Sequence, residues 1–305
     1  MSPVYADVHL ASWNDGRARR AIVDFVRLVT QEGTPSYLPP NQRIVTFDND
    51  GTLWSEQPMY FQYMFAMDRV KAMAADHPEW KTQEPFKHLL NGDMKAFVEG
   101  GDNSIHAVVA QLHSGTTTDE FQAIVKEWIK KARHPTTQRP YTAMAYQPML
   151  ELLAFLRSNG FKTFIVTGGG VEFVRCMAEE TYGIPPDQVL ATSNKLKYEL
   201  RNGKPVLVNT AELQFLNNSE GKVIGIQTFI GRRPIMAVGN ADVDLQMLQW
   251  TTTLNAGVWG NTGETPRLAM VIHHDDAVRE WAYDRKSPVG KLDKTLDEAK
   301  AKGWI

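Results

Sequence analysis

Three short apolar segments of this sequence each end in a polar loop that contains glycine. The segments cover residues 43–47, 161–166 and 234–238. Helical patterns lie between and after them, and strands that alternate with helices are typical of a parallel sheet with helices on both faces. We therefore expect an α/β fold, a three-layer α/β/α arrangement around a parallel sheet. Its three polar loops should meet at the carboxyl edge of the sheet, where such folds bind ligands.

Hydrophobic spacing and turn residues predict further elements along the chain. A helix is expected after Ser12 and Asn14, which are candidate N-caps. A fourth parallel strand is expected at 268–272, and Asn202-Gly203 is typical of the turn of a hairpin over 197–208. The other predicted helices cover residues 59–75, 105–112, 119–133, 150–158, 171–182, 221–229, 243–250 and 276–283.

Residues 56–145 differ from the rest because helical patterns dominate them and few runs resemble strands. One of these helices is preceded by Thr117 with Glu120 three residues later, which is a capping-box pattern. The loops at Asp48 and Thr167 are 167 − 48 = 119 residues apart, too far for one strand–helix–strand connection. We expect a core of residues 1–55 and 146–305 with a helical cap domain, 56–145, inserted into it.

Composition limits the kinds of partner that we expect for this protein and the cellular compartment in which we expect it. The 305 residues include 33 Lys and Arg against 35 Asp and Glu, a formal net charge of −2. Such a balance gives no general attraction to nucleic acid or anionic membranes, so we expect neither as a partner. A single cysteine, Cys176, excludes a disulfide within the chain. The first residues do not resemble a secretory signal, so we expect a cytoplasmic protein, with an exported mature form as the alternative.

The loop after the first apolar segment reads Asp48-Asn49-Asp50-Gly51-Thr52. Two carboxylates this close behind a buried strand repel each other unless a cation or a proton relieves the repulsion. A hard divalent ion with oxygen ligands does this, and Mg²⁺ is the common choice in phosphate chemistry. An aspartate can also attack phosphorus while a second one transfers protons. The alternative is a solvated turn, in which Asp and Gly are frequent.

The other two loops carry groups suited to an anion and a metal. Thr167 and three glycines precede a helix, where a hydroxyl and free backbone N–H groups can bind an anion. The segment 239–244, Gly-Asn-Ala-Asp-Val-Asp, offers oxygen ligands. Each loop alone also fits an ordinary capped helix. The three together indicate one site.

Taken in order, these motifs resemble those of the haloacid dehalogenase superfamily, and within it the phosphoserine-phosphatase-like branch. That branch has a lysine shortly before the last motif, where this chain has Lys222, and a hairpin like the one around Asn202-Gly203. The inserted helices fall where the family places its cap. The resemblance implies a Mg²⁺-dependent phosphatase that hydrolyses small phosphomonoesters, including phosphoserine-like substrates, through an aspartyl-phosphate.

The resemblance also implies a role for each matching residue. Asp48 would be the nucleophile and Asp50 the general acid and base. The phosphoryl oxygens would be bound by Thr167, Gly168 and Lys222. The dehalogenases of the superfamily lack the second aspartate of the first motif and need no metal, so the presence of Asp50 favours a phosphatase.

The implied metal ligands are Asp48, the backbone carbonyl of Asp50, and oxygens of Asn240 and Asp244. The family usually has Asp where this chain has Asn240, so a negative charge is missing there. Asp242 adds another carboxylate close by, and which of these three residues contacts the metal stays open.

Glu56 lies four residues after the first motif. In amino-acid phosphatases of this branch a glutamate near this point binds the substrate amine, so the resemblance makes Glu56 a candidate specificity residue. The alternative is a solvated carboxylate in the first turn of a helix.

Three further interpretations remain open. The segment His273-His274-Asp275-Asp276 resembles a metal cluster, but adjacent histidines at a strand end point to opposite faces, so a helix cap is preferred. Loss of charge at Asn240 is compatible with a phosphate-binding regulatory module that no longer turns over. A phosphotransferase that uses an alcohol as acceptor is the third alternative.

Overall fold

The computed structural model describes residues 9–100, 108–253 and 265–305. Its described part contains one sheet of six strands in the order β4-β3-β2-β1-β5-β6. All neighbouring strands run parallel except β3 and β4, which are antiparallel. The strands are β1 (Ile44–Phe47), β2 (Lys162–Gly170), β3 (Val189–Arg201), β4 (Lys204–Phe215), β5 (Met236–Gly239) and β6 (Leu268–Val271). The predicted parallel α/β fold is confirmed.

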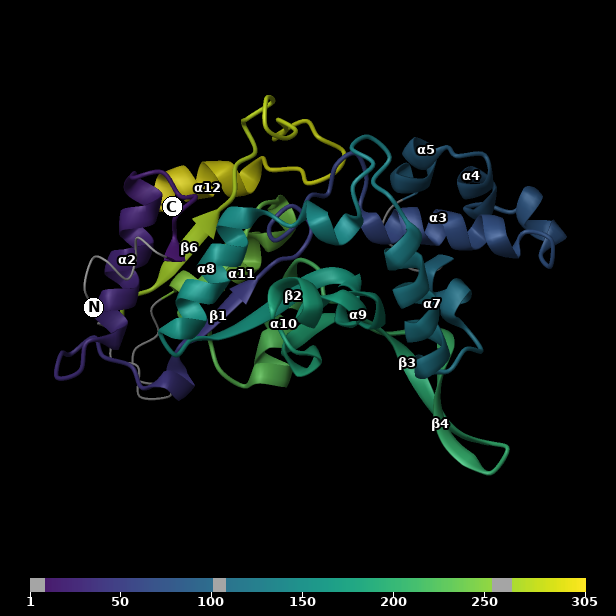
Figure 1. The fold of residues 1–305 in the computed structure, drawn as a ribbon, viewed down its shortest axis with the longest axis horizontal. Coiled ribbons are helices and arrows are strands. Elements are labelled where there is room, and N and C mark those ends of the chain that lie inside the picture. Colours follow the sequence, from purple (N-terminus) through teal and green to yellow (C-terminus); the bar gives the residue numbers. More distant parts are fainter. Residues whose placement is uncertain (1–8, 101–107, 254–264) are drawn as a thin grey trace.

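Helices cover both faces of the sheet (Figure 1). The labelled helices of the described residues are α2 (Arg17–Thr30), α3 (Phe61–Met73), α4 (Phe86–Leu90), α5 (Met94–Glu99), α7 (Thr118–Lys131), α8 (Gln147–Ser158), α9 (Val171–Tyr182), α10 (Glu220–Gly225), α11 (Leu245–Thr252) and α12 (Lys294–Lys302). A π-helical turn, Ile226–Ile230, continues α10. No helix in the described part of the chain is both long and apolar enough to cross a membrane.

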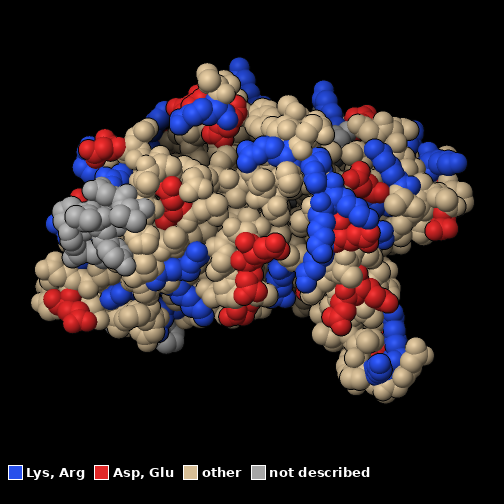
Figure 2. Space-filling view, viewed as in Figure 1, with Lys and Arg blue, Asp and Glu red and all other residues tan. Residues whose placement is uncertain are grey.

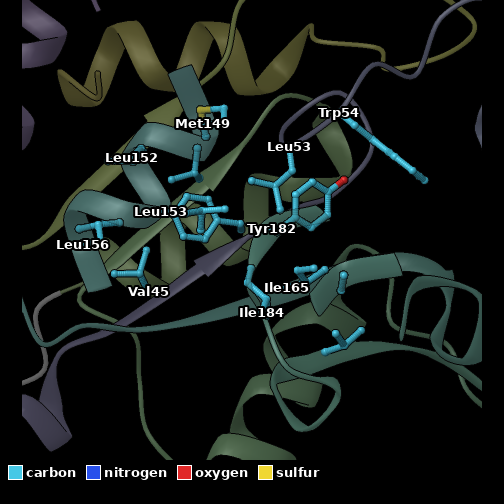
Figure 3. Close-up of a cluster of buried hydrophobic side chains, with 14 of the residues drawn as sticks. Val45, Leu53, Trp54, Met149, Leu152, Leu153, Leu156, Ile165, Tyr182 and Ile184 are labelled. Carbon is cyan, nitrogen blue, oxygen red and sulfur yellow. The ribbon is translucent and has the colours of Figure 1, made fainter. Parts of the chain in front are cut away.

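Alternating side chains of each strand enter two separate hydrophobic cores. Val45 and Phe47 of β1 pack with α2, α8 and α9 on one face, whereas Ile44 packs with α10 and α11 on the other. A strand buried on both faces therefore reads as a continuous apolar run, as the sequence of β1 does. Figure 3 shows the first core, in which Leu53 and Trp54 of the loop after β1 lie near Tyr182 of α9.

The labelled helices of residues 56–145, which are α3, α4, α5 and α7, lie together beside the sheet (Figure 1). Their outer part has its own buried cluster, which includes Val70, Trp80 and Leu89. Phe61 and Phe65 of α3 and Phe121 of α7 instead belong to the main core. The insert is thus anchored on the sheet domain by α3 and α7, which suits its predicted role as a cap.

Most predicted elements are present, with three differences. Helix α2 begins at Arg17 after Gly16, so Ser12 and Asn14 do not cap it; the Ser12 hydroxyl donates to Glu151 instead. Residues 276–283 form a single turn and not a helix: the Asp276 carboxylate accepts from the Val278 and Arg279 N–H groups, as an N-cap does, but the Tyr283 N–H then donates to the His274 carbonyl. Of the helix expected at 105–112, residues 105–107 lie outside the described residues, and 108–113 is helical.

Several short helices were not predicted. Helix α4 has only five residues, too few to show a helical period. Helix α12 buries only Thr295 and Ala299, so it lacks an apolar stripe. The predicted capping box of α7 is confirmed: the Glu120 N–H donates to the Thr117 hydroxyl at 3.1 Å, and the Thr117 N–H donates to the Glu120 carboxylate at 2.7 Å.

Candidate active site

The loops after β1, β2 and β5 meet at one pocket of about 170 Å³ at the carboxyl edge of the sheet. The insert supplies the opposite wall. Residues of the sheet domain that line the pocket include Asp48, Asp50, Thr167, Gly168, Thr192, Asn194, Asn218 and Lys222. Those of the insert include Glu56, Tyr60, Gln62, Tyr63, Val109 and His113.

Lys222 joins two of the three loops. It is fully buried at the start of α10, and its Nζ donates to Asp48 Oδ1 at 2.7 Å and to Asp244 Oδ1 at 2.5 Å. Burial alone would lower the pKa of Lys222, but the charges of Asp244 and Asp48 raise it above its usual value. The lysine therefore stays protonated and places its charge beside Asp48.

The same environment acts on Asp48 in the opposite direction. Burial raises the pKa of its carboxyl group, and the neighbouring Asp244 raises it further, against the lowering effect of Lys222. Only one carboxylate oxygen of Asp48 takes part in the bond to Lys222. The other oxygen is the atom that could attack a substrate in the pocket.

Asp50 lies two residues further along and is held by the indole of Trp54. Trp54 Nε1 donates to Asp50 Oδ1 at 2.8 Å, and its ring packs against Phe61 with ring centroids 4.7 Å apart. Trp54 thus packs between the insert and the sheet domain and also orients the carboxyl group. Burial raises the pKa of Asp50, which favours the protonated form that a general acid needs.

The glycine loop after β2 presents backbone groups to the pocket. The buried Thr167 hydroxyl accepts from the Gly169 N–H at 3.2 Å, and the Gly168 carbonyl accepts from the Thr192 hydroxyl at 2.8 Å. Gln62 of α3 reaches this loop from the insert, where its Oε1 accepts from the Gly170 N–H at 2.7 Å. A loop fixed in this way can bind an anion without reorganising.

Glu56 and Asn240 form a buried pair on the other side of Asp50. Asn240 Nδ2 donates to Glu56 Oε1 at 2.7 Å, and Asn240 Oδ1 accepts from the Thr52 hydroxyl at 3.0 Å. The Tyr283 hydroxyl also donates to Glu56 Oε1, at 2.8 Å. Burial, with a further contribution from the charges of Asp50 and Asp48, raises the pKa of Glu56 to about 8, against the lowering effect of the hydrogen bonds from Tyr283 and Asn240.

The two aspartates after Asn240 have other partners. Asp244 Oδ1 accepts from Lys222, and its Oδ2 accepts from the N–H groups of Asn240 and Ala241. Asp242 Oδ1 accepts from the N–H groups of Asp293 and Thr295 and so caps α12. Asn240 Oδ1 accepts one hydrogen bond, from the Thr52 hydroxyl, and keeps a second lone pair for a cation, whereas Asp244 is already held by Lys222 and two backbone N–H groups.

The two adjacent histidines contact different groups. His274 is buried, and its Nε2 donates to the Gly51 carbonyl at 2.7 Å while its Nδ1 lies 3.0 Å from Glu280. His273 lies 3.5 Å from Asp284. His274 therefore supports the loop that carries Asp48 and Asp50.

The donors near Asp48 fit a hard divalent ion. They are a carboxylate oxygen of Asp48, the backbone carbonyl of Asp50 and the amide oxygen of Asn240, all oxygen atoms. Within residues 9–100, 108–253 and 265–305, no group of three or more His, Cys, Asp and Glu side chains is arranged to hold a metal. The three proposed donors do not conflict with this absence, because two of them are a backbone carbonyl and a side-chain amide, which do not belong to those four kinds of side chain. Three buried carboxyl groups, Asp48, Glu56 and Asp244, and the half-buried Asp50 lie near one lysine, and a cation would offset their charge.

Two residues that organise the site were missed from the sequence. Gln62 comes from the insert, and the buried Asn217 donates to the carbonyls of Thr167 and Leu190 at 3.1 Å and 2.9 Å. Asn217 stands only five residues before Lys222, and a polar residue so near that lysine was a usable signal. The contact of Gln62 depends on how the insert packs, which local sequence does not encode.

Comparison with known proteins identifies the family. A model of haloacid dehalogenase-like hydrolases matches residues 42–250, more than half of the chain, so this protein belongs to that family of hydrolases. The resemblance inferred from the motifs is confirmed at this level. No protein with a curated description matches the chain.

Solved structures share the fold at low sequence identity. A protein of unknown function from Bordetella pertussis Tohama I is 14% identical, with a TM-score of 0.54 and coverage of 86% of this chain and 96% of that one. A functionally unknown protein from Anaerococcus prevotii DSM 20548 is 16% identical, with a TM-score of 0.50 and coverage of 94% and 90%. A phosphoserine phosphohydrolase-like protein from Francisella tularensis is 17% identical, with a TM-score of 0.38 and coverage of 68% and 82%.

Proposed function

We propose that this protein is a Mg²⁺-dependent phosphatase that hydrolyses small phosphomonoesters through an aspartyl-phosphate on Asp48. The observation that carries the proposal is the buried contact of Lys222 Nζ with Asp48 Oδ1 at 2.7 Å, beside Asp50 and the glycine loop. A carboxylate nucleophile, a cation, and a threonine hydroxyl beside a glycine segment in one pocket are groups suited to phosphoryl transfer.

Each residue has a distinct part in the proposed reaction. An oxygen of Asp48 forms a bond to phosphorus while the bond from phosphorus to the leaving oxygen breaks, and Asp50 gives its proton to that oxygen. Asp50 then takes a proton from water as the water oxygen attacks phosphorus and the bond to Asp48 breaks. Inorganic phosphate leaves, and both aspartates return to their starting states.

The phosphoryl oxygens would be bound by Lys222, Thr167 and the backbone of Gly168. Asp48, the carbonyl of Asp50 and Asn240 would hold Mg²⁺, which supplies positive charge to the phosphoryl oxygens when bound. The insert, residues 56–145, would act as the cap that keeps bulk water from the pocket.

The charges of the pocket also suggest a substrate class. Lys222 is the one cationic side chain among the described residues that line it, whereas Glu56 and Glu172 are acidic. Burial lowers the pKa of His113 to about 3, so this histidine is neutral. Tyr60 and Tyr63 complete an uncharged aromatic wall. We infer that the organic part of the substrate is uncharged or carries an amine, and that added anionic groups are disfavoured.

A panel of phosphomonoesters tests both parts of the proposal. We expect phosphate release from phosphorylated alcohols and amino alcohols in Mg²⁺, weaker release from phosphoserine, and least from phosphoglycerate. Chelation of the metal, or Asp48→Asn, should abolish release, and the phosphoenzyme mimic beryllofluoride should bind the wild type but not Asp48→Asn. Full activity of either the chelated or the Asp48→Asn protein would contradict the mechanism, and consumption of an added alcohol in place of phosphate release would indicate a phosphotransferase.

A further inference from the structure

The buried pair of Glu56 and Asn240 is an unusual feature of this site. Glu56 has an exposed fraction of 1% and Asn240 of 1%, and the two side chains come from opposite ends of the sequence, 184 residues apart. A buried ionised carboxylate is costly unless it is paired. The amide of Asn240 and the hydroxyl of Tyr283 are neutral donors, so they satisfy its hydrogen bonds without balancing its charge.

The backbone is shaped around this carboxylate. Gly51 has a φ of +72°, and a Cβ there would lie 2.1 Å from Asn240 Nδ2 and 2.3 Å from Glu56 Oε1. Gly290 has a φ of +66°, and a Cβ there would lie 1.8 Å from the same oxygen. Two glycine loops therefore close on the Glu56 side chain, and any larger residue at either position would displace it.

The amide nitrogen and the amide oxygen of Asn240 contact different partners. Its Nδ2 donates to Glu56 Oε1, and its Oδ1 accepts from the Thr52 hydroxyl. When a bound cation favours the ionised form of Glu56, the amide that donates to this anion becomes polarised, and its oxygen gains negative charge. The oxygen is the atom of Asn240 that could bind a cation.

From this geometry we propose that Glu56 supplies, through Asn240, the negative charge that the asparagine lacks toward the bound divalent cation. Asn240 gives the oxygen ligand, and Glu56 gives the charge behind it. In this arrangement Glu56 is a positioning residue that acts through Asn240, and the charge of the cation in turn favours its ionised form. The inference rests on the proposed Mg²⁺ dependence of the site.

The contacts of Glu56 make this role more direct than recognition of a substrate amine. Its Oε1 already accepts two hydrogen bonds, and its side chain is almost wholly covered. A substrate amine would have to approach past Asn240 and Tyr283. The two roles predict different measurements, because an amine-binding residue affects the KM for amino-alcohol phosphates and not the affinity for the metal.

A charge exchange between the two positions tests the proposal. Titration calorimetry would measure the Kd for Mg²⁺ of the full-length, metal-free wild type and of Glu56→Gln, Asn240→Asp and the double variant. We expect Glu56→Gln to weaken binding by about 10–100-fold, as loss of a supporting residue behind a ligand does. Asn240→Asp places two carboxylates in contact and should not bind more tightly than the wild type. The double variant restores one carboxylate and should return to within about threefold of the wild type, a difference well under 1 kcal/mol.

Two controls separate the possible outcomes. Asp242→Asn removes a carboxylate two residues from Asn240 that caps α12, and it should leave the Kd for Mg²⁺ unchanged. Thermal unfolding in chelator shows whether each variant folds. If Glu56→Gln alone does not fold, the comparison of the double variant with Asn240→Asp decides, because only the double variant is expected to bind well.

The contrary results are equally specific. A wild-type Kd in Glu56→Gln, or a double variant that binds no better than either single variant, would overturn the inference and leave the phosphatase proposal standing. An unchanged Kd with a raised KM for amino-alcohol phosphates would assign Glu56 to the substrate instead. Absence of Mg²⁺ binding by the wild type would overturn the inference and the metal dependence together.

Discussion

The two walls of the pocket are built from different kinds of side chain. The sheet domain contributes buried ionisable groups that are fixed by short hydrogen bonds, such as Lys222 between Asp48 and Asp244. Apart from Glu56 at its first position, the insert contributes tyrosines, an amide, a valine and a neutral histidine to the described lining. Under the proposed function, the sheet domain performs the chemistry and the insert selects the substrate. On the face in Figure 2, positive and negative side chains are interspersed.

The largest effect should follow from a change in the sheet-domain wall. Asp50→Asn keeps an oxygen that can accept from Trp54 Nε1 but cannot transfer a proton. We expect kcat to fall by roughly 10²–10⁴-fold, the usual contribution of a general acid and base. Steady-state kinetics measure the fall, and an unchanged melting temperature shows that the fold is intact. Wild-type kcat in this variant would place the proton transfer elsewhere.

An intermediate effect concerns stability and pH. Glu56 has a pKa of about 8 in the folded protein against an ordinary value of 4.5, so the folded state holds a proton that the unfolded state has lost between these values. The free energy of unfolding of the metal-free protein should therefore fall as pH rises from about 4.5 to about 8, because the folded state binds more protons there. Glu56→Gln should remove part of this slope. Urea unfolding at pH 5, 6.5 and 8 in chelator measures it.

Identical slopes in the wild type and Glu56→Gln would contradict the assignment of that proton to Glu56. The slope should not vanish, because burial also raises the pKa values of Asp48 and Asp50, and these groups remain in the variant.

The smallest effect should come from the insert. Gln62→Met keeps the size of the side chain but removes the oxygen that accepts from the Gly170 N–H. Loss of one such hydrogen bond costs about 0.5–1.5 kcal/mol. We expect KM to rise several-fold with little change in kcat. A loss in kcat as large as that of Asp50→Asn would show that the insert takes part in the chemistry, against the division proposed above.

The same contrast explains which features of the fold and the site could be predicted from the sequence. The sheet, the hairpin and the three loops were predicted because each is encoded locally, by a continuous apolar strand or by a turn such as Asn202-Gly203. The convergence of Asp48, Thr167 and Lys222 follows from parallel topology, which places strand ends at one edge.

What the sequence did not reveal depends on long-range packing. The contact of Glu56 with Asn240 spans 184 residues, and that of Gln62 with Gly170 spans 108. A periodic pattern carries no information about such pairs. Likewise, Asp276 was expected to begin a helix. Its carboxylate caps a single turn, but the Tyr283 N–H then donates to the His274 carbonyl and Trp281 packs against the main core, contacts that a continued helix would not make.

The hairpin of β3 and β4 also contacts the insert, at the loop before α7. The Asn209 N–H donates to the Thr116 carbonyl at 2.9 Å, and the Gly115 N–H donates to the Asn209 carbonyl at 2.9 Å. The loop before α7 is therefore held as a short extra strand against the hairpin. A rigid rotation of the insert away from the sheet would have to break these backbone bonds at every turnover. The hairpin thus sets a mechanical limit on how wide the site opens, and so on the bulk of the molecules that can enter and leave it.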